Sequence, residues 1–236
     1  HDFSANINPL RLPDEVLSEV SQSLWHCENY PDPRCRELIR AISEREWFPS
    51  GNIVCGNGAA DMIYRIVSAL NPRRALVCAP TFSEYEKALT EHNCEVYRHY
   101  LKSTNDFKLT DSILEEITQN VDIVFLCNPN NPTGATIPRQ LLKLIFNKCS
   151  STGTFLVIDE CFLDFVPGGA DLSAKPMLND NSAILKAFTK IYAMPGLRLG
   201  YALFGSELMS KRVAATGQAW SVSTPAQAAG IAALKM

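Results

Sequence analysis

The sequence predicts an α/β protein with a three-layer α/β/α architecture, in which helices cover both faces of a mostly parallel, seven-stranded sheet. Three observations support this prediction. Short runs that are apolar throughout are typical of strands buried on both faces. These runs alternate along the chain with stretches of helical period, which is the order of a parallel sheet. The 236 residues, of which 46% are hydrophobic and 20% charged, can bury a sizeable core.

The predicted strands are mostly short runs of Val, Ile, Leu, Phe and Cys, the composition of buried strands. Glycine or asparagine directly follows three of the seven runs, at Gly56, Asn128 and Gly205. In chain order, the predicted strands are residues 52–55, 74–78, 95–100, 122–127, 154–159, 183–188 and 199–204.

Helical patterns fill four of the intervals between these strands. In each pattern, apolar residues recur three or four positions apart, so they share one face of a helix. The predicted helices are residues 59–70, 81–92, 110–120 and 138–149. A sheet of parallel strands joined by such helices collects its ligands at the carboxyl ends of the strands.

Composition and charge argue against several classes of partner. The formal net charge is −3 and no run of Lys or Arg occurs, which argues against a nucleic-acid surface. No stretch approaches the apolar length that spans a bilayer, and the opening residues HDFSANINPL do not form a signal peptide. We therefore expect a cytoplasmic protein that binds neither nucleic acid nor membrane.

The eight cysteines do not pair as Cys-x-x-Cys, and most lie in apolar, strand-like runs. We interpret them as small buried hydrophobic residues in a reducing cytoplasm, with no metal site. Disulfides or zinc ligation are the alternatives. The residues are Cys27, Cys35, Cys55, Cys78, Cys94, Cys127, Cys149 and Cys161.

Polar residues that can carry chemistry follow the predicted strands. The segments are GNGAAD (56–61), APTF (79–82), NPNNPTG (128–134), DECF (159–162) and the dipeptide Thr189-Lys190. Because the carboxyl ends of parallel strands meet at one edge of a sheet, we expect these segments to form a single site.

Lys190 lies in the stretch KAFTKIYAMPGLRLGY (186–201), shortly before a Pro195-Gly196 turn and Arg198. A lone lysine is most often a solvated loop residue. A desolvated lysine can instead lose its proton and attack a carbonyl group. Arg198 favours this second interpretation, because its planar guanidinium could hold a phosphate near the lysine.

The remaining segments have an ordinary and a functional interpretation. GNGAAD lets the backbone approach an anion at a helix N-terminus, although many strand-to-helix turns contain two glycines. Asn131 is either part of a turn between prolines or a side-chain donor. Asp159 either caps the next helix or holds a ring nitrogen protonated. Together with Lys190 and Arg198, these parts fit pyridoxal 5'-phosphate.

The order of these motifs resembles the fold-type I, aminotransferase-like pyridoxal phosphate enzymes, and the resemblance covers essentially all 236 residues. It implies that Lys190 is the Schiff-base lysine and that Asp159 pairs with the pyridine nitrogen. It also implies that Asn131 bonds the phenolic oxygen and that Phe82 stacks on the ring. The implied phosphate-binding residues are Gly58, Ala59, Ala60, Thr189 and Arg198.

The resemblance also bears on domains and assembly. It implies an N-terminal arm, with part of a small domain, at residues 1–30 and a large cofactor-binding domain at residues 31–236. The family's small C-terminal domain is expected to be missing from this sequence, as in a fragment. Tyr30 resembles the tyrosine that reaches the phosphate of a neighbouring subunit, which implies a homodimer.

Two branches of the family look closest, and both act on phosphorylated amines or amino acids. The segments DFSANINPL, FTKIYAMPGLRLGY and AWSVS resemble the threonine-phosphate decarboxylases of cobalamin biosynthesis. Histidinol-phosphate aminotransferases share the general pattern but usually carry tyrosine where this chain has Phe162, so we favour the decarboxylase. Ala187 stands where a phosphate-binding Ser or Thr is common.

The expected decarboxylase substrate is L-threonine O-3-phosphate, and the product is (R)-1-amino-2-propanol O-phosphate. Asn6 and Asn8 are weak candidates for the second anion site that a phosphorylated substrate needs, and either can simply be a turn residue. A third interpretation is an aminotransferase-like domain that binds the cofactor without catalysis.

Overall fold

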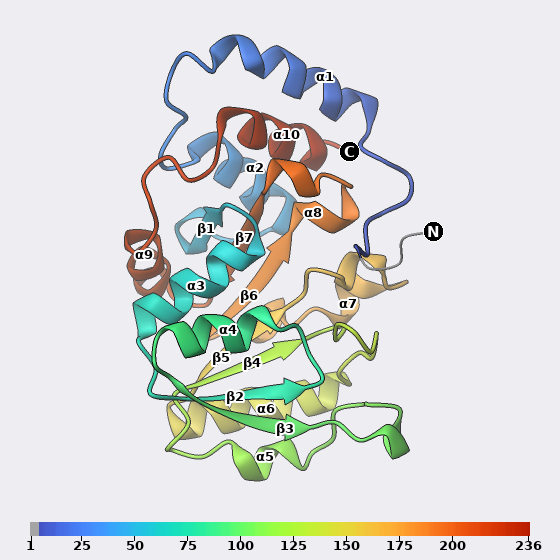
Figure 1. The fold of residues 1–236 in the computed structure, drawn as a ribbon, viewed down its shortest axis with the longest axis vertical. Helices are drawn as coiled ribbons and strands as arrows, with labels where there is room; N and C mark the ends of the chain where they lie inside the picture. Colours follow the sequence, from blue (N-terminus) through green and yellow to red (C-terminus); the bar gives the residue numbers. More distant parts are fainter. Residues whose placement is uncertain (1–4) are drawn as a thin grey trace.

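The computed structural model describes residues 5–236 and arranges them in three layers around a central sheet (Figure 1). The strand order is β1-β7-β6-β5-β4-β2-β3. The seven predicted strands are confirmed, each within one residue at either end. They are β1 (Ile53–Gly56), β2 (Arg74–Ala79), β3 (Glu95–Tyr100), β4 (Ile123–Cys127), β5 (Phe155–Asp159), β6 (Ser182–Ala187) and β7 (Gly200–Phe204).

Five neighbouring strands of the sheet run parallel, from β3 through β2, β4 and β5 to β6. Only β7 runs antiparallel to its neighbours β6 and β1, so the predicted mostly parallel sheet is confirmed. The register pairs Cys127 with Asp159 and Asp159 with Leu185. The carboxyl ends of β4, β5 and β6 are therefore level with one another at one edge of the sheet.

The helices cover both faces of the sheet. They are α1 (Asp14–Ser23), α2 (Arg36–Glu46), α3 (Ala59–Leu70), α4 (Glu84–Glu91), α5 (Ile113–Glu116), α6 (Arg139–Thr152), α7 (Gly169–Leu172), α8 (Phe188–Ile191), α9 (Glu207–Ala215) and α10 (Thr224–Leu234). Strand residues alternate between two hydrophobic clusters. One cluster includes α3, α4 and α9, and the other includes α1, α2, α5, α6 and α10.

Three of the four predicted helices are present, as α3, α4 and α6, although α4 is shorter than expected. The predicted helix 110–120 is wrong in extent, because only Ile113–Glu116 is α-helical. Its flanks form other structure: the hydroxyls of Thr110 and Ser112 bond each other, and the backbone at Ile117 is extended. Local hydrogen bonds of this kind compete with a helix.

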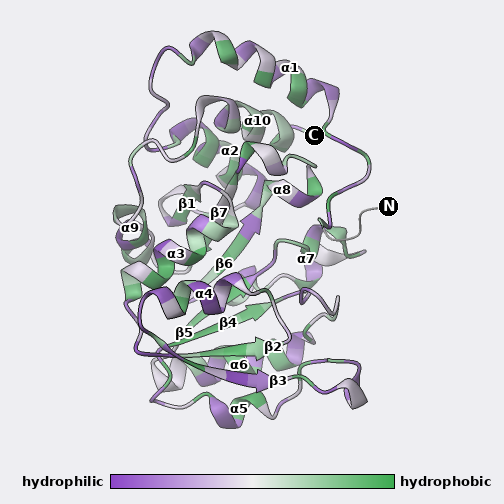
Figure 2. Cartoon of the chain, viewed as in Figure 1, coloured by the Kyte–Doolittle hydropathy of each residue, from purple (hydrophilic) through white to green (hydrophobic). Residues whose placement is uncertain are grey.

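Helix α10 was not predicted, and it is built mainly from small apolar residues. Ser223 caps its first turn by accepting the Ala226 N–H, and Pro225 lies within that turn. The helix has no polar face because it packs between α1 and α2, and Figure 2 shows its mixed, weakly hydrophobic colouring. Contact between α1 and α10 brings the N-terminal and C-terminal parts of the chain together. The domain boundary expected at residue 30 stays a prediction.

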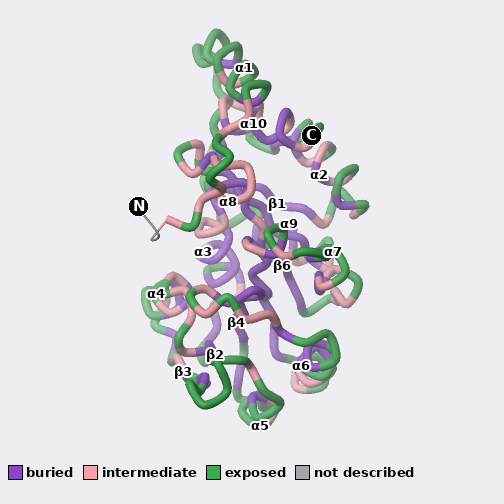
Figure 3. The backbone as a smooth tube through the Cα atoms, turned by 90° about the vertical axis from the view of Figure 1, so that its right-hand side faces the viewer, coloured by how far each residue is buried: buried purple, intermediate pink, exposed green. Residues whose placement is uncertain are grey.

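Burial follows the layers: the inner strands are buried, whereas the edge strand β3 and the outer faces of the helices are mostly exposed (Figure 3). Seven of the eight cysteines are buried, as predicted, and Cys27 is exposed. Within residues 5–236, no helix is both long enough and apolar enough to cross a bilayer.

Candidate active site

A cavity of about 210 Å³ opens at the carboxyl ends of β4, β5 and β6. Eight of the ten residues predicted to hold a cofactor line this cavity, although they are far apart in the sequence. They are Ala59, Ala60, Phe82, Asn131, Asp159, Thr189, Lys190 and Arg198. The single site expected from the strand ends is therefore present. Cys127, Cys161, Phe162, Ala187 and Pro195 complete its lining.

Lys190 lies on α8, the single helical turn that follows β6, and is partly buried. Burial lowers the pKa of its ammonium, and the charge of Arg198 acts in the same direction, while Cys161 and Asp159 oppose them. The Lys190 Nζ lies 5.6 Å from the centre of the Phe162 ring and donates a hydrogen bond to the Ala5 carbonyl at 2.7 Å. The environment therefore favours the neutral, nucleophilic amine more than water does.

Asp159 ends β5 with its carboxylate fixed by two donors. Its Oδ1 accepts the Cys161 N–H at 2.9 Å, and its Oδ2 accepts the Tyr85 hydroxyl at 2.7 Å. Tyr85 is fully buried and stacks on Phe125, with ring centres 5.1 Å apart. A carboxylate has lone pairs for further donors, so Asp159 can still accept a proton-bearing ring nitrogen in the cavity.

Sequence reasoning missed Tyr85. The available signal was its position three residues after Phe82 on a predicted helix, which puts both rings on one side of that helix. The two rings meet edge to face, with centres 5.6 Å apart. Tyr85 therefore contacts both Phe82, which is predicted to stack on the cofactor ring, and Asp159, which is predicted to hold the ring nitrogen protonated.

Gly58 and Arg198 form a corner that suits an anion. Gly58 has a φ of +88°, and a Cβ built on it would lie 2.7 Å from Arg198 Nη2. Gly200 is equally confined, since its Cβ would lie 2.4 Å from the Ala59 backbone nitrogen. The glycines thus let the guanidinium approach the N-terminus of α3, where free N–H groups favour negative charge. These residues fit a phosphate group.

A second cavity, of about 400 Å³, adjoins the first and shares Asn131 and Phe162 with it. Residues of the β5–β6 connection, Phe165 and Val166, form part of its wall. All ten residues that line it are uncharged: Asn6, Ile7, Pro129, Asn130, Asn131, Pro132, Gly134, Phe162, Phe165 and Val166.

The other predicted site residues lie in different places. Asn6 lines the second cavity, whereas the Asn8 amide donates to the Ile191 carbonyl at 2.8 Å and accepts the Leu10 N–H at 3.0 Å. Tyr30 is 80% exposed and is not part of the cavity lining. Its ring lies 4.6 Å from that of Trp220, which is also exposed.

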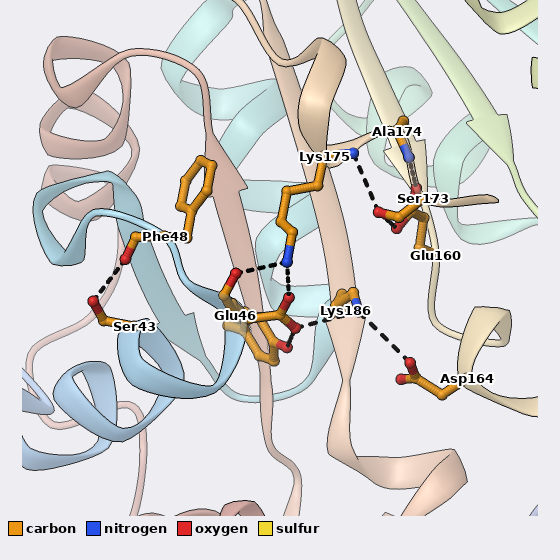
Figure 4. A network of polar contacts seen from close by, with 10 residues as sticks. Ser43, Glu46, Phe48, Glu160, Asp164, Ser173, Ala174, Lys175 and Lys186 are labelled. Atoms are coloured by element: carbon orange, nitrogen blue, oxygen red, sulfur yellow. Dashed lines mark hydrogen bonds and ion pairs between the residues drawn. The ribbon is translucent and has the colours of Figure 1, made fainter. Parts of the chain in front are cut away.

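A buried charge network lies on the opposite face of the sheet from the cavity (Figure 4). At its centre, the Glu46 carboxylate accepts hydrogen bonds from Lys175 at 2.9 Å and Tyr201 at 2.6 Å. Lys186 lies 3.2 Å from the same carboxylate and 3.7 Å from Asp164. Burial would raise the pKa of Glu46, but Lys186, Tyr201 and Lys175 outweigh it and hold the pKa at about 2.

Glu160 extends this arrangement from the end of β5. Its carboxylate accepts the Ser173 hydroxyl and the Ala174 N–H, each at 2.7 Å. Burial raises its pKa, and these two donors oppose the rise. With the Lys186–Asp164 and Lys175–Glu46 pairs, Glu160 fastens the β5–β6 connection, which carries Phe162 and its neighbours to both cavities.

Comparison with known proteins identifies the family of this chain. The model of the aminotransferase class I and II family matches residues 1–236. A threonine-phosphate decarboxylase of Salmonella typhimurium is 41% identical over 99% of this chain and 64% of its own length. A histidinol-phosphate aminotransferase of Methanococcoides burtonii is 31% identical over 98% of this chain and 63% of its own length. The chain thus spans less than two thirds of either relative.

Among solved structures, the histidinol-phosphate aminotransferase of Clostridium acetobutylicum superposes with a TM-score of 0.91 at 28% identity. The match covers 99% of this chain and 69% of that one. The expected fold is therefore confirmed by an experimental relative as well as by the strand order. The match of the family model over the whole sequence shows that this chain belongs to the aminotransferase class I and II family.

Proposed function

We propose that this protein is a threonine-phosphate decarboxylase that uses pyridoxal 5'-phosphate. The proposed reaction converts L-threonine O-3-phosphate to (R)-1-amino-2-propanol O-phosphate, a step of cobalamin biosynthesis. The observation that carries the proposal is the convergence of Lys190, Asp159 and Arg198 on one cavity. The 41% identity to a threonine-phosphate decarboxylase supports this choice within the family.

The lining residues fit the cofactor part by part. Lys190 is the nucleophile that would bond its aldehyde carbon, and Asp159 would hold its ring nitrogen protonated. Asn131 would donate to its phenolic oxygen, and Phe82 would cover its ring. The phosphate would lie in the corner formed by Gly58, Ala59, Ala60, Thr189 and Arg198.

When bound, pyridoxal phosphate supplies an electron sink for the pair released at the substrate's α-carbon. This chain's residues then orient the substrate and move protons. Burial lowers the pKa of Lys190, so this amine gives up its proton more readily than a solvated lysine does. Phe162 presents an apolar ring beside Lys190, so Asn131 is the proposed donor to the phenolic oxygen.

A homodimer is part of the proposal. Tyr30 and Trp220 form an exposed aromatic pair, and Trp25 and Leu24 are exposed nearby in the sequence. Large exposed aromatic residues are enriched in interfaces, so this surface suits a second copy of the chain. We propose that Tyr30 reaches the phosphate site of that copy. We also propose a cytoplasmic location, because seven buried thiols suit a reducing compartment.

Transamination of histidinol phosphate with 2-oxoglutarate is the second candidate. The 31% and 28% identities to two histidinol-phosphate aminotransferases support it. Phe162 favours the decarboxylase, since the aminotransferases usually carry tyrosine there. A third candidate is an aminotransferase-like domain that binds pyridoxal phosphate without turning over any amine.

Product analysis separates these three candidates. The protein, loaded with pyridoxal phosphate, is given phosphothreonine, and in a separate reaction histidinol phosphate with 2-oxoglutarate. Mass spectrometry then identifies the products, with the Lys190→Ala variant as the matched control. Aminopropanol phosphate supports the decarboxylase, and imidazole-acetol phosphate with glutamate supports the aminotransferase. Cofactor binding with no product from any amine supports the third candidate.

A further inference from the structure

Residues 5–8, which we call the N-terminal strap, cross the site at Lys190. We propose that Asn8 is a positioning residue that fastens this strap to α8, so that the Ala5 carbonyl receives the Lys190 ammonium whenever the lysine is not bonded to the cofactor. The proposal deepens the function proposed above and rests on it for its catalytic consequence. The contact itself belongs to the cofactor-free chain.

Asn8 joins the strap to α8 by two hydrogen bonds on consecutive carbonyls. Its backbone N–H donates to the Lys190 carbonyl at 3.1 Å, and its side-chain amide donates to the Ile191 carbonyl at 2.8 Å. The Lys190 carbonyl also accepts the Ala193 N–H at 3.3 Å, so this first bond is shared with the turn that ends α8. For the Ile191 carbonyl, the Asn8 amide is the donor recorded within residues 5–236, and the Asn8 Oδ1 accepts the Leu10 N–H.

This attachment sets the position of the rest of the strap. Asn6 adopts a φ of 50°, and it and Ile7 line the second cavity. Ala5 then lies with its carbonyl oxygen 2.7 Å from Lys190 Nζ. The strap therefore contacts Lys190 at both its backbone and its side chain.

The ammonium needs such an acceptor. An ammonium has three donors, and Lys190 is partly buried beside the positive charge of Arg198. Asp159 and Cys161 also face it, but in the part of the chain that the structure describes the Ala5 carbonyl is the hydrogen-bond acceptor recorded for Nζ. A hydrogen bond from an ammonium favours its charged form, so the Ala5 carbonyl acts against burial and Arg198.

The catalytic consequence follows because Lys190 would be bonded to the cofactor in one state of the protein and free in another. In the proposed reaction, Lys190 would hold the cofactor in the resting protein and, once free of it, would take up a proton. The Ala5 carbonyl would then hold the ammonium in a fixed position at the edge of the cavity. Loss of Asn8 would release the strap and remove this resting position.

The test begins with the cofactor-free protein and the variant Asn8→Ala. Lys190 is labelled with acetic anhydride over a range of pH and its peptide is quantified by mass spectrometry, with the exposed Lys143 as internal standard. We expect the pKa of Lys190 to fall by about one unit in Asn8→Ala, which corresponds to about tenfold more neutral amine below that pKa. Ile7→Ala alters the same strap at a side chain that lines the second cavity, and we expect labelling close to wild type.

Circular dichroism melts establish that each variant is folded before it is labelled. If folded Asn8→Ala shows the same pKa and labelling rate at Lys190 as wild type, the strap does not hold the ammonium and the proposal is wrong. Asn8→Leu gives a second reading, because its side chain is of similar size but can neither donate to the Ile191 carbonyl nor add a charge beside Lys190. We expect it to resemble Asn8→Ala, and wild-type labelling would count against the role of the amide.

A second measurement tests the loaded protein. Phosphothreonine is titrated against the absorbance of the lysine-bound cofactor, and we expect Asn8→Ala to need several-fold more substrate to displace the lysine. An unchanged midpoint would overturn the catalytic consequence. If the wild-type chain develops no cofactor absorbance at all, the proposed function fails, whereas the labelling experiment still decides the role of the strap.

Discussion

Replacing Glu46 with glutamine tests the charge network behind the sheet (Figure 4). The Glu46 side chain is 11% exposed and interacts with Lys186, Lys175 and Tyr201. These contacts hold its pKa at about 2, against an ordinary value of 4.5. At about 1.4 kcal/mol per pKa unit, this depression corresponds to about 3 kcal/mol of unfolding free energy. Breaking a buried ion pair by removing one partner costs a similar amount, about 3–5 kcal/mol.

The direction of the Glu46 pKa shift determines how the loss of unfolding free energy in Glu46→Gln changes with pH. Because the folded-state pKa of Glu46 lies below the unfolded value, its stabilisation is complete above pH 4.5 and is lost as the pH falls toward 2. The Glu46→Gln variant has no such carboxylate. The difference in unfolding free energy between wild type and variant should therefore be about 3 kcal/mol at pH 7 and about half of that near pH 3.

Urea unfolding followed by far-ultraviolet circular dichroism, at several pH values from 3 to 7, measures this difference. Glu95→Gln is the matched control, because Glu95 pairs with Arg74 at 3.4 Å while both side chains are about half exposed. Such a surface pair contributes about 0–1 kcal/mol. A Glu46→Gln loss no larger than that of Glu95→Gln at pH 7, or one that does not shrink with acid, would refute the reasoning.

Three further predictions concern the cavity. Lys190→Ala should abolish both the visible absorbance of the loaded protein and borohydride fixation of the cofactor to the chain; a persisting band would show that another group bonds the aldehyde. Tyr85→Phe should lower kcat by about tenfold with little change in cofactor affinity, because Asp159 loses a charge-assisted hydrogen bond worth about 1.5–3 kcal/mol; kcat within about twofold of wild type would contradict this. Gly58→Ala should raise the dissociation constant for pyridoxal phosphate by about tenfold or more, measured by fluorescence titration, because its Cβ meets Arg198 in a strained backbone conformation; unchanged affinity would argue against the anion corner.

The sheet and much of the cavity could be predicted from the sequence because both depend on local patterns. Apolar runs identified the strands, and parallel strands bring the residues after them to one edge. The sequence therefore predicts that Asp159, Asn131 and Lys190 share one site, and all three line the cavity. The orientation of the Asp159 carboxylate was not predictable, since its partner Tyr85 lies 74 positions away and looks like an ordinary core aromatic.

Other features carry no signal in the residue types at all. The acceptor for Lys190 is a backbone carbonyl, which every residue possesses, so Ala5 could not be singled out from the sequence. Lys186 lies in strand β6, four residues before Lys190, and its sequence context is the same apolar run. Only the packing of α2 against the sheet shows that its partner is Glu46.

Strand alternation explains how the cavity and the charge network share two strands without mixing. Asp159 and Ala187 face the cavity, whereas their neighbours Glu160 and Lys186 face the network, because successive side chains point to opposite sides of a sheet. The ends of β5 and β6 are thus fastened on the face opposite the cavity, by charged side chains that do not line the cavity. Loss of Glu46 should therefore lower stability at neutral pH while the lysine-bound cofactor keeps its absorbance. A variant that lost both together would show that the network also sets the position of Lys190.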